Sequence, residues 1–195
     1  MAQDSKQLDR KPPYRRIKSD WFFRHSKQII DELGKNLTEG LTVSGRDEFR
    51  KSDVHLYDIW RLDLSDFKKV VVFKIKEIFI QENKIYNYDL DYSTINVQLA
   101  RYRVGEFYEW HSDDLVLNTY KKYNNIRKMS MSIPLNIGEF EGGDMEIMFM
   151  NKAKKINFEQ GNALIFPSFI EHRVLPVTKN TRYSLVAWIS GPAWR

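Results

Sequence analysis

The chain has 195 residues, of which 42% are hydrophobic and 29% are charged, and it contains no cysteine. This length fits one ordinary domain, and the composition is that of a globular protein able to bury a core. The absence of cysteine excludes a disulfide-stapled scaffold and thiolate metal ligands, so any transition-metal site must use histidines and carboxylates. No apolar run approaches the roughly 20 residues of a membrane span, and no signal peptide is recognisable. We therefore expect a cytoplasmic protein that makes no membrane contact.

The formal net charge of +5 is concentrated near the amino terminus. Residues 1–18 hold six basic and two acidic residues, whereas residues 19–195 hold 25 basic and 24 acidic residues. Pro12, Pro13 and the lack of apolar periodicity predict a flexible, extended arm. We interpret this arm as a solubilising terminus, and binding of the arm to nucleic acid or another polyanion stays open.

Residues 19–94 are predicted to form a helical support region of the same domain. Apolar residues recur at intervals of three and four over residues 19–36, which predicts a first helix. A second helix is predicted over residues 65–81, where apolar side chains share one face. Residues 38–62 between them are ambiguous, although residues 54–57 alternate as a strand would.

From about residue 95 the pattern changes to short alternating or apolar segments separated by turn residues. A succession of such segments is typical of an all-β sandwich or barrel, and eight strands would fit a jelly roll. The predicted fold class is therefore α+β and mainly β, with a jelly-roll core over residues 95–195 and supporting N-terminal helices. The predicted strands are 95–103, 106–111, 129–135, 144–150, 154–158, 162–166, 171–176 and 182–189.

Three residues in the strand-rich half have the types and spacing of metal ligands. His111 and Asp113 are two positions apart, so on a strand their side chains point the same way. His172 follows the turn at Pro167 and Ser168 and is suited to supply a third ligand from another strand. Two imidazoles and one carboxylate form the facial arrangement of non-haem Fe(II) oxygenases, which leaves coordination positions open.

Arg182 stands ten residues after His172 at the start of a predicted strand. It shares the parity of Ser184 and Trp188, so these three side chains would enter a barrel interior together. A buried guanidinium needs a partner, and the carboxylate of a ligand would provide one through two parallel hydrogen bonds. The alternative is an exposed arginine at the end of a hairpin.

Four motifs together resemble one family, the 2-oxoglutarate and Fe(II)-dependent dioxygenases, and within it the prolyl 4-hydroxylase-like branch. The resemblance covers about residues 95–192, and it implies a double-stranded β-helix. Upstream, only residues 50–54 are faintly similar to the family's segment near the substrate channel. The four motifs are residues 102–113, residues 140–144, residues 161–168, and residues 172–174 leading to Arg182.

The resemblance also implies roles for individual residues. The iron ligands would be His111, Asp113 and His172. The co-substrate 2-oxoglutarate would be bound through its distal carboxylate by Arg182, with Tyr102 and Ser184 as further contacts. Weaker correspondences place three residues at the substrate, namely Arg127, Trp188 and Tyr108.

The implied reaction uses Fe(II), 2-oxoglutarate and O2, with ascorbate as a reductant, and releases succinate and CO2. The leading hypothesis is hydroxylation of a prolyl residue in a peptide or protein. One alternative keeps this chemistry for a free amino acid, another side chain or a nucleobase. A second alternative is a metal-binding jelly roll without turnover. The nearly neutral body of the chain argues against a nucleic-acid substrate for the core.

The remaining candidates have simpler interpretations. His25 and His55 have no ligand partner at strand spacing and are expected to be structural or surface histidines. Asp114 points away from His111 by parity, which indicates a loop carboxylate or a partner of the ligands. The aromatic residues are expected to fill a jelly-roll core rather than to stack on single-stranded nucleic acid.

Overall fold

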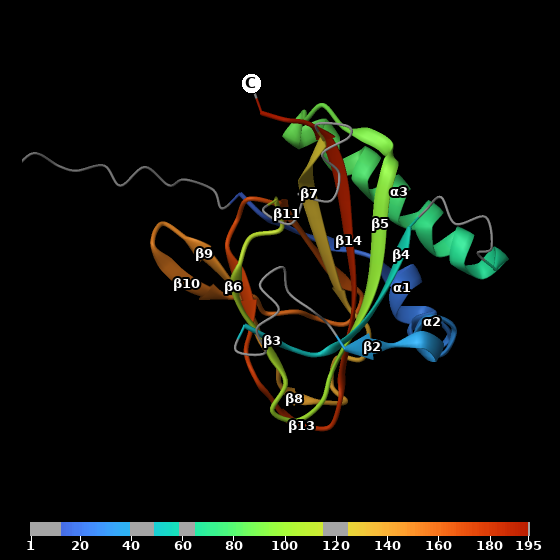
Figure 1. Ribbon diagram of the computed structural model, residues 1–195, viewed down its shortest axis with the longest axis vertical. Helices are drawn as coiled ribbons and strands as arrows, with labels where there is room; N and C mark the ends of the chain where they lie inside the picture. Colours follow the sequence, from blue (N-terminus) through green and yellow to red (C-terminus); the bar gives the residue numbers. More distant parts are fainter. Residues whose placement is uncertain (1–12, 40–48, 59–64, 115–124, 195) are drawn as a thin grey trace, which may run out of the picture.

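The computed structural model describes residues 13–39, 49–58, 65–114 and 125–194. Two antiparallel sheets dominate these residues, and helices cover one face of the larger sheet (Figure 1). The described residues contain no helix that is long and apolar enough to cross a membrane. The expectation of a mainly β chain with supporting helices is confirmed.

The larger sheet has seven strands, and the smaller main sheet has five. In spatial order, the seven-stranded sheet consists of β1 (Arg15–Lys18), β11 (Asn162–Pro167), β7 (Asn125–Pro134), β14 (Arg182–Pro192), β5 (Asp91–Tyr102), β4 (Asp53–Asp58) and β2 (Thr38–Glu39). The five-stranded sheet consists of β10 (Lys152–Lys155), β9 (Met145–Phe149), β12 (His172–Val174), β6 (Phe107–His111) and β3 (Arg50–Lys51). A short third sheet pairs β13 (Val177–Lys179) with β8 (Glu141–Gly142).

The predicted first helix is divided into shorter pieces, and the second is longer than predicted. The helical segments are α1 (Asp20–Arg24), α2 (Ser26–Leu33), the 3-10 turn η1 (Gly34–Asn36) and α3 (Asp66–Tyr86). The division occurs at His25, which ends α1 and precedes α2. The side chain of Ser65 caps α3 by accepting a hydrogen bond from the Lys68 amide, and Asn87 ends the helix in a left-handed conformation.

The main core lies between the helices and the outer face of the seven-stranded sheet. Alternate residues of β14 point into this core, and β5 and β7 contribute in the same way. The helices complete it with large, fully buried side chains that include Phe22, Ile29, Ile75 and Phe79. Burial of this apolar face fixes which side of the sheet is left to face the five-stranded sheet.

The amino-terminal segment is partly built into the sheet. Residues 1–12 lie outside the described residues, but β1 pairs antiparallel with β11. The prediction of a flexible arm over residues 1–18 is therefore wrong for residues 15–18. Arg15, Arg16 and Lys18 lie on an edge strand, where basic side chains oppose pairing with the edge of another sheet. Arg15 is also anchored to Glu82 of α3 by an ion pair of 2.6 Å.

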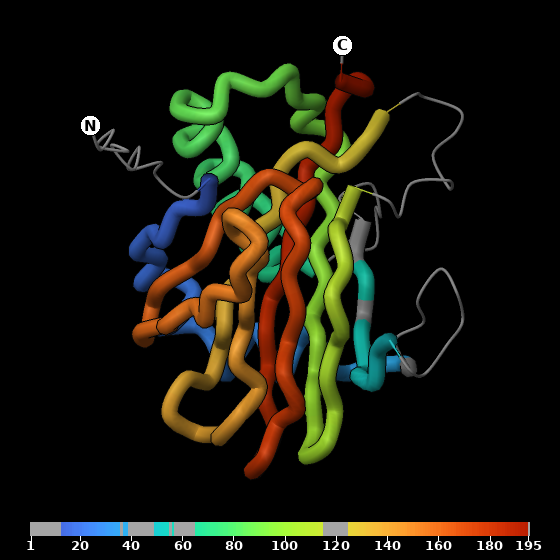
Figure 2. The backbone as a smooth tube through the Cα atoms, turned by 90° about the vertical axis from the view of Figure 1, so that its left-hand side faces the viewer, coloured from blue at the N-terminus to red at the C-terminus, as the bar shows by residue number. Residues whose placement is uncertain are grey.

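Each of the eight predicted strands overlaps an observed one, but several observed strands are additional. The region 38–62 contributes β2, β3 and β4, so residues 19–94 are a mixed rather than a purely helical support. Strands of two residues, such as β2 and β3, are too short to show a period of two. The β5–β6 and β13–β14 turns lie at the same end of the molecule (Figure 2), where Val104 bridges Val177.

Candidate active site

The three predicted metal ligands lie together at the facing ends of two paired strands. His111 is the last residue of β6 and His172 the first of β12, and the two are direct cross-strand partners. Asp113 follows two residues after His111, just beyond the end of β6. One potential ligand atom from each of the three residues lies within 4.8 Å of the others. The predicted convergence is therefore present, although Asp113 belongs to a bend rather than to the strand.

Hydrogen bonds orient both imidazoles for metal binding. His111 Nδ1 lies 2.7 Å from the carbonyl oxygen of Glu109, and His172 Nδ1 lies 3.0 Å from that of Ile170. A carbonyl only accepts, so each Nδ1 carries the proton and each Nε2 keeps a free lone pair. These Nε2 atoms lie 3.9 Å and 3.7 Å from the oxygens of Asp113. Such carbonyl-anchored imidazoles are the usual form of metal-ligating histidines.

The electrostatics favour the ligand forms of these side chains. Burial, followed by the neighbouring His172, lowers the pKa of His111 to about 3, so its imidazole is neutral at neutral pH. Burial alone would raise the pKa of Asp113, but the nearby imidazoles and Arg127 outweigh it and lower that pKa. A neutral imidazole and an ionised carboxylate are the protonation states that a divalent cation requires.

Arg182 is the buried cation that the parity argument predicts. It is only 2% exposed, and within the described ranges no carboxylate forms an ion pair with it. Burial lowers the pKa of its guanidinium, which lies 5.3 Å from the Tyr102 ring centroid and 6.0 Å from that of Phe140. The buried hydroxyl of Ser184 likewise has no hydrogen-bond partner among the described residues. A buried cation beside an unpaired hydroxyl suits a bound carboxylate.

One cavity of about 310 Å³ connects the metal cluster with Arg182, and all nine predicted site residues line it. Its volume is in the range of small-molecule binding sites. Arg127 stacks on the Trp188 ring with its guanidinium carbon 4.0 Å from the ring centroid, and Tyr108 stacks on His111. Burial raises the pKa of Tyr108 to about 12, so its hydroxyl stays protonated. The cavity lining thus combines a metal-binding cluster, a buried cation suited to an anion, and aromatic side chains.

The lining also includes polar residues to which the sequence analysis gives no role, among them Gln98 and Arg50. Gln98 on β5 is buried and has the same parity as Tyr102, which is the signal that identifies it. Arg50 on β3 places its guanidinium carbon 4.5 Å from the centroid of the Tyr108 ring and donates to Ser52 Oγ at 2.8 Å. Arg50 belongs to the segment 50–54, whose likeness to a substrate-channel segment was the only signal for it.

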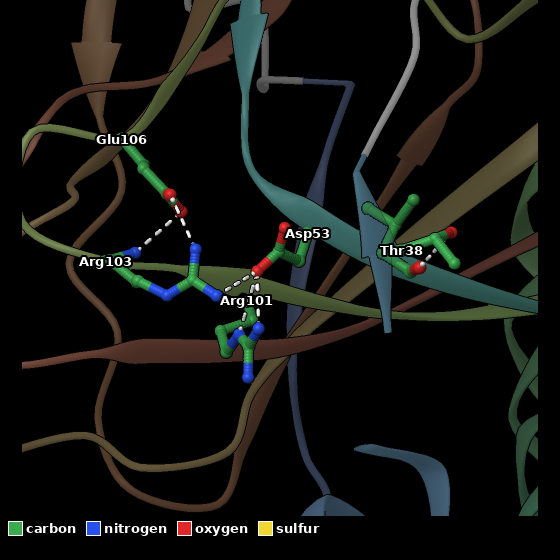
Figure 3. Close-up of polar contacts among 6 residues, drawn as sticks. Thr38, Asp53, Arg101, Arg103 and Glu106 are labelled. Carbon is green, nitrogen blue, oxygen red and sulfur yellow. Dashed lines mark hydrogen bonds and ion pairs between the residues drawn. The ribbon is translucent and has the colours of Figure 1, made fainter. Parts of the chain in front are cut away.

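An ion-pair network joins β4, β5 and the turn that follows β5 (Figure 3). Asp53 of β4 accepts hydrogen bonds from Arg101 of β5 at 2.5 and 3.1 Å and forms an ion pair with Arg103 at 2.6 Å. Glu106, in the turn between β5 and β6, accepts hydrogen bonds from the backbone amide and the guanidinium of Arg103. Tyr102 lies between the two arginines in sequence and faces the cavity. The network therefore ties the β4 segment to the strand that carries Tyr102.

The sequence analysis gives simpler interpretations to His25, His55 and Asp114, and the structure describes these residues to different extents. The ring of His25 stacks on Trp21, and its Nδ1 lies 2.8 Å from the Trp21 carbonyl oxygen, which confirms a structural histidine. The side chain of His55 lies outside the described residues. One buried oxygen of Asp114 has no hydrogen-bond partner in the described part of the chain, and Asp114 is not a member of the metal cluster.

Comparison with known proteins identifies a family. The model of the 2OG-Fe(II) oxygenase superfamily matches residues 97–190. A PKHD-type hydroxylase of Idiomarina loihiensis is 33% identical over 94 residues, which cover 48% of this chain and 41% of that protein. A PKHD-type hydroxylase of Synechococcus sp. is 28% identical over 95 residues, covering 48% of this chain and 40% of that protein. The matched region thus spans about two fifths of the length of these relatives.

Solved structures share the fold over nearly the whole chain. A prolyl-4-hydroxylase from Pseudomonas putida superimposes with a TM-score of 0.71 and 17% identity, covering 93% of this chain and 94% of that chain. A prolyl hydroxylase from Trichoplax adhaerens, in complex with a hypoxia inducible factor peptide fragment, gives a TM-score of 0.70 at 17% identity, covering 91% and 83%.

The family's description supplies the groups that fit the metal cluster and the buried cation. Fe(II) fits two imidazoles and a carboxylate, and 2-oxoglutarate carries a carboxylate that a buried arginine without a carboxylate partner in the described ranges would bind. Residues 97–190, which carry the whole metal cluster and Arg182, therefore belong to the 2OG-Fe(II) oxygenase superfamily.

Proposed function

We propose that this chain is an Fe(II)- and 2-oxoglutarate-dependent dioxygenase that hydroxylates a prolyl residue in a peptide or protein. The two main sheets would be the walls of a double-stranded β-helix, with residues 19–94 as a support region of the same domain. The observation that carries the proposal is that one cavity is lined by the metal cluster and by Arg182, which has no carboxylate partner among the described residues. A metal-binding module without turnover has no need of such a buried cation.

The residues divide the work within the cavity. His111, Asp113 and His172 would hold the iron, while Arg182 would bind the distal carboxylate of 2-oxoglutarate with help from Ser184 and Tyr102. When bound, Fe(II) and 2-oxoglutarate supply the oxidative chemistry that places one oxygen atom of O2 in a C–H bond and releases succinate and CO2. The protein fixes the positions of the reactants and keeps water out.

The rest of the cavity lining is suited to a peptide. The buried indole N–H of Trp188 has no acceptor among the described residues, so a carbonyl group of a substrate could accept from it. Arg127 stacks on the same ring, and Tyr108 and Arg50 extend the aromatic and cationic wall. We assign Arg127, Trp188 and Tyr108 to substrate binding. Similarity of fold to prolyl hydroxylases, one of them in complex with a peptide, favours proline as the target.

Anaerobic titration with Fe(II) and 2-oxoglutarate tests the oxygenase chemistry. We expect the weak visible charge-transfer band of the chelate, followed by succinate formation when O2 is admitted. Folded protein that shows neither would contradict the proposal. The substrate is tested separately by incubating the loaded enzyme with proline-rich peptides and measuring a mass gain of one oxygen atom on proline. Formation of succinate without any peptide product would support the oxygenase chemistry and contradict the proposal of a prolyl substrate.

A further inference from the structure

Two fully buried serines form a hydrogen-bonded chain that ends on the metal-binding carboxylate. Ser130 lies on β7, and Ser168 follows the last residue of β11. Ser130 Oγ lies 2.6 Å from Asp113 Oδ2, and the two serine hydroxyl oxygens lie 2.9 Å apart. Both serines are 0% exposed, so water does not compete for these contacts. Ser130 points away from the helix-covered face of the sheet, where its neighbours Met129 and Met131 lie.

The direction of each hydrogen bond follows from counting protons. An ionised carboxylate only accepts, so Ser130 must donate its single hydroxyl proton to Asp113. Ser130 then has none left for Ser168, and Ser168 must donate to Ser130. The chain therefore runs in one direction, from Ser168 through Ser130 to Asp113. Hydroxyls arranged in series polarise one another, which strengthens the terminal bond to the charge.

Backbone hydrogen bonds also hold Asp113 and Ser168 next to the strand that carries Ser130. The Asp113 amide donates to the carbonyl oxygen of Ser168 at 2.8 Å, and the Ser168 amide donates to the carbonyl oxygen of Lys128 at 3.0 Å. The Asp113 loop, the turn after β11 and strand β7 are thus joined at one point. Asp113 Oδ2 accepts from Ser130 and lies 3.7 Å from His172 Nε2, while Oδ1 lies 3.9 Å from His111 Nε2.

We propose that Ser130 is a positioning residue for the metal centre, and that Ser168 acts through it. The Ser130 hydroxyl engages one lone pair of Oδ2 and so favours binding of the ion through Oδ1. Without this bond the carboxylate is free to rotate and to chelate the ion through both oxygens. The inference rests on the proposed function, because it requires that the His111, Asp113 and His172 cluster binds a divalent cation. Partners of this kind beyond the ligands themselves typically change metal affinity by about 10- to 100-fold.

Binding of Mn(II) alone to the full chain, followed by electron paramagnetic resonance, tests the proposal without turnover. Ser130→Ala is expected to weaken Mn(II) binding about 10- to 100-fold and to change the spectrum at saturation, because the carboxylate can then chelate. Ser168→Ala is expected to weaken binding by less than about tenfold, since Ser130 still reaches Asp113. Ser132→Ala, two residues along the same strand, removes a buried hydroxyl that does not contact Asp113 and is the matched control.

The double variant Ser130→Ala/Ser168→Ala separates a chain from two independent contacts. If Ser168 acts through Ser130, the double variant binds Mn(II) no more weakly than Ser130→Ala. Multiplicative losses would overturn the role given to Ser168. Wild-type affinity and an unchanged spectrum in folded Ser130→Ala would overturn the whole inference, and Ser130→Cys, which keeps a weak donor, replaces it if the alanine variant does not fold. Failure of the wild-type chain to bind Mn(II) would instead reject the proposed metal site, and this inference with it.

Discussion

The two faces of the seven-stranded sheet use the same strands for opposite purposes. On the helix-covered face, β14 presents Leu185, Ala187 and Ile189 to an apolar core. On the cavity face, the alternate residues include Arg182, Ser184 and Trp188, and each carries a polar group without a matching hydrogen-bond or ion-pair partner in the described parts of the chain. One face therefore stabilises the fold, while the other gives up stability to keep polar groups available for ligands.

Loss of a metal ligand on the cavity face should have the largest effect on activity. It should leave the stability that the helix-covered face provides unchanged. We expect His111→Ala to reduce uncoupled succinate formation by more than about 100-fold, because removing a ligand costs more than removing a partner of a ligand. The thermal unfolding midpoint of the metal-free protein should not fall. His25→Ala, at a structural histidine outside the cavity, is the comparison for activity. Wild-type activity of His111→Ala would show that the cluster is not the site of the reaction.

Replacement of the buried cation Arg182 should separate the effect on co-substrate binding from the effect on stability. Arg182→Met removes the proposed partner of the co-substrate carboxylate, and truncation of such a pair costs about 2–5 kcal/mol, or at least about 30-fold in affinity. The methionine also removes a desolvated charge that no described carboxylate balances, so the free energy of unfolding should stay equal or rise. The two measurements are 2-oxoglutarate titration and urea unfolding. A large loss of stability at unchanged affinity would reverse the roles given to the two faces.

Truncation of a core side chain on the helix-covered face should instead lower stability and leave metal binding unchanged. Leu185→Ala lies next to Ser184 in sequence but points into the apolar core, where it is 0% exposed. We expect the free energy of unfolding to fall by about 2–5 kcal/mol, because the transfer and cavity terms add. The remaining folded protein should bind Mn(II) with wild-type affinity. Weakened metal binding would mean that the faces are coupled through the strand.

The ion-pair network of Asp53 should contribute least to the free energy of unfolding. Asp53→Asn keeps the shape of the side chain but removes the charge that faces Arg101 and Arg103, and partly exposed pairs contribute about 0–1 kcal/mol. We expect a decrease of this size in the free energy of unfolding, measured with urea. Glu141→Gln, which removes the exposed pair with Lys179, should change it less. An effect as large as that of Leu185→Ala would show that the network is part of the structural core.

Much of the candidate site could be predicted because strand parity is a local property. The positions of Arg182, Ser184 and Trp188 on one face follow from alternate spacing, and all three line the cavity. The contact between Asp113 and Ser130 could not be predicted in this way, since the two residues are 17 positions apart and Asp113 lies in a bend rather than on a strand. Strand β1 was missed because three of its four residues are basic, a pattern that also fits a solvated terminus.

The sequence by itself determined the types of residue available and their order. With no cysteine and four histidines, a metal site had to use imidazole and carboxylate, and the alternation of polar and apolar residues determined which face each strand would bury. Only the tertiary structure decided that His111 and His172 are cross-strand partners, that Arg182 lacks a carboxylate partner in the described chain, and that two serines reach Asp113. The physical reason is that parity acts between neighbours along one strand. Convergence of side chains depends instead on how separate strands pair and how two sheets face each other.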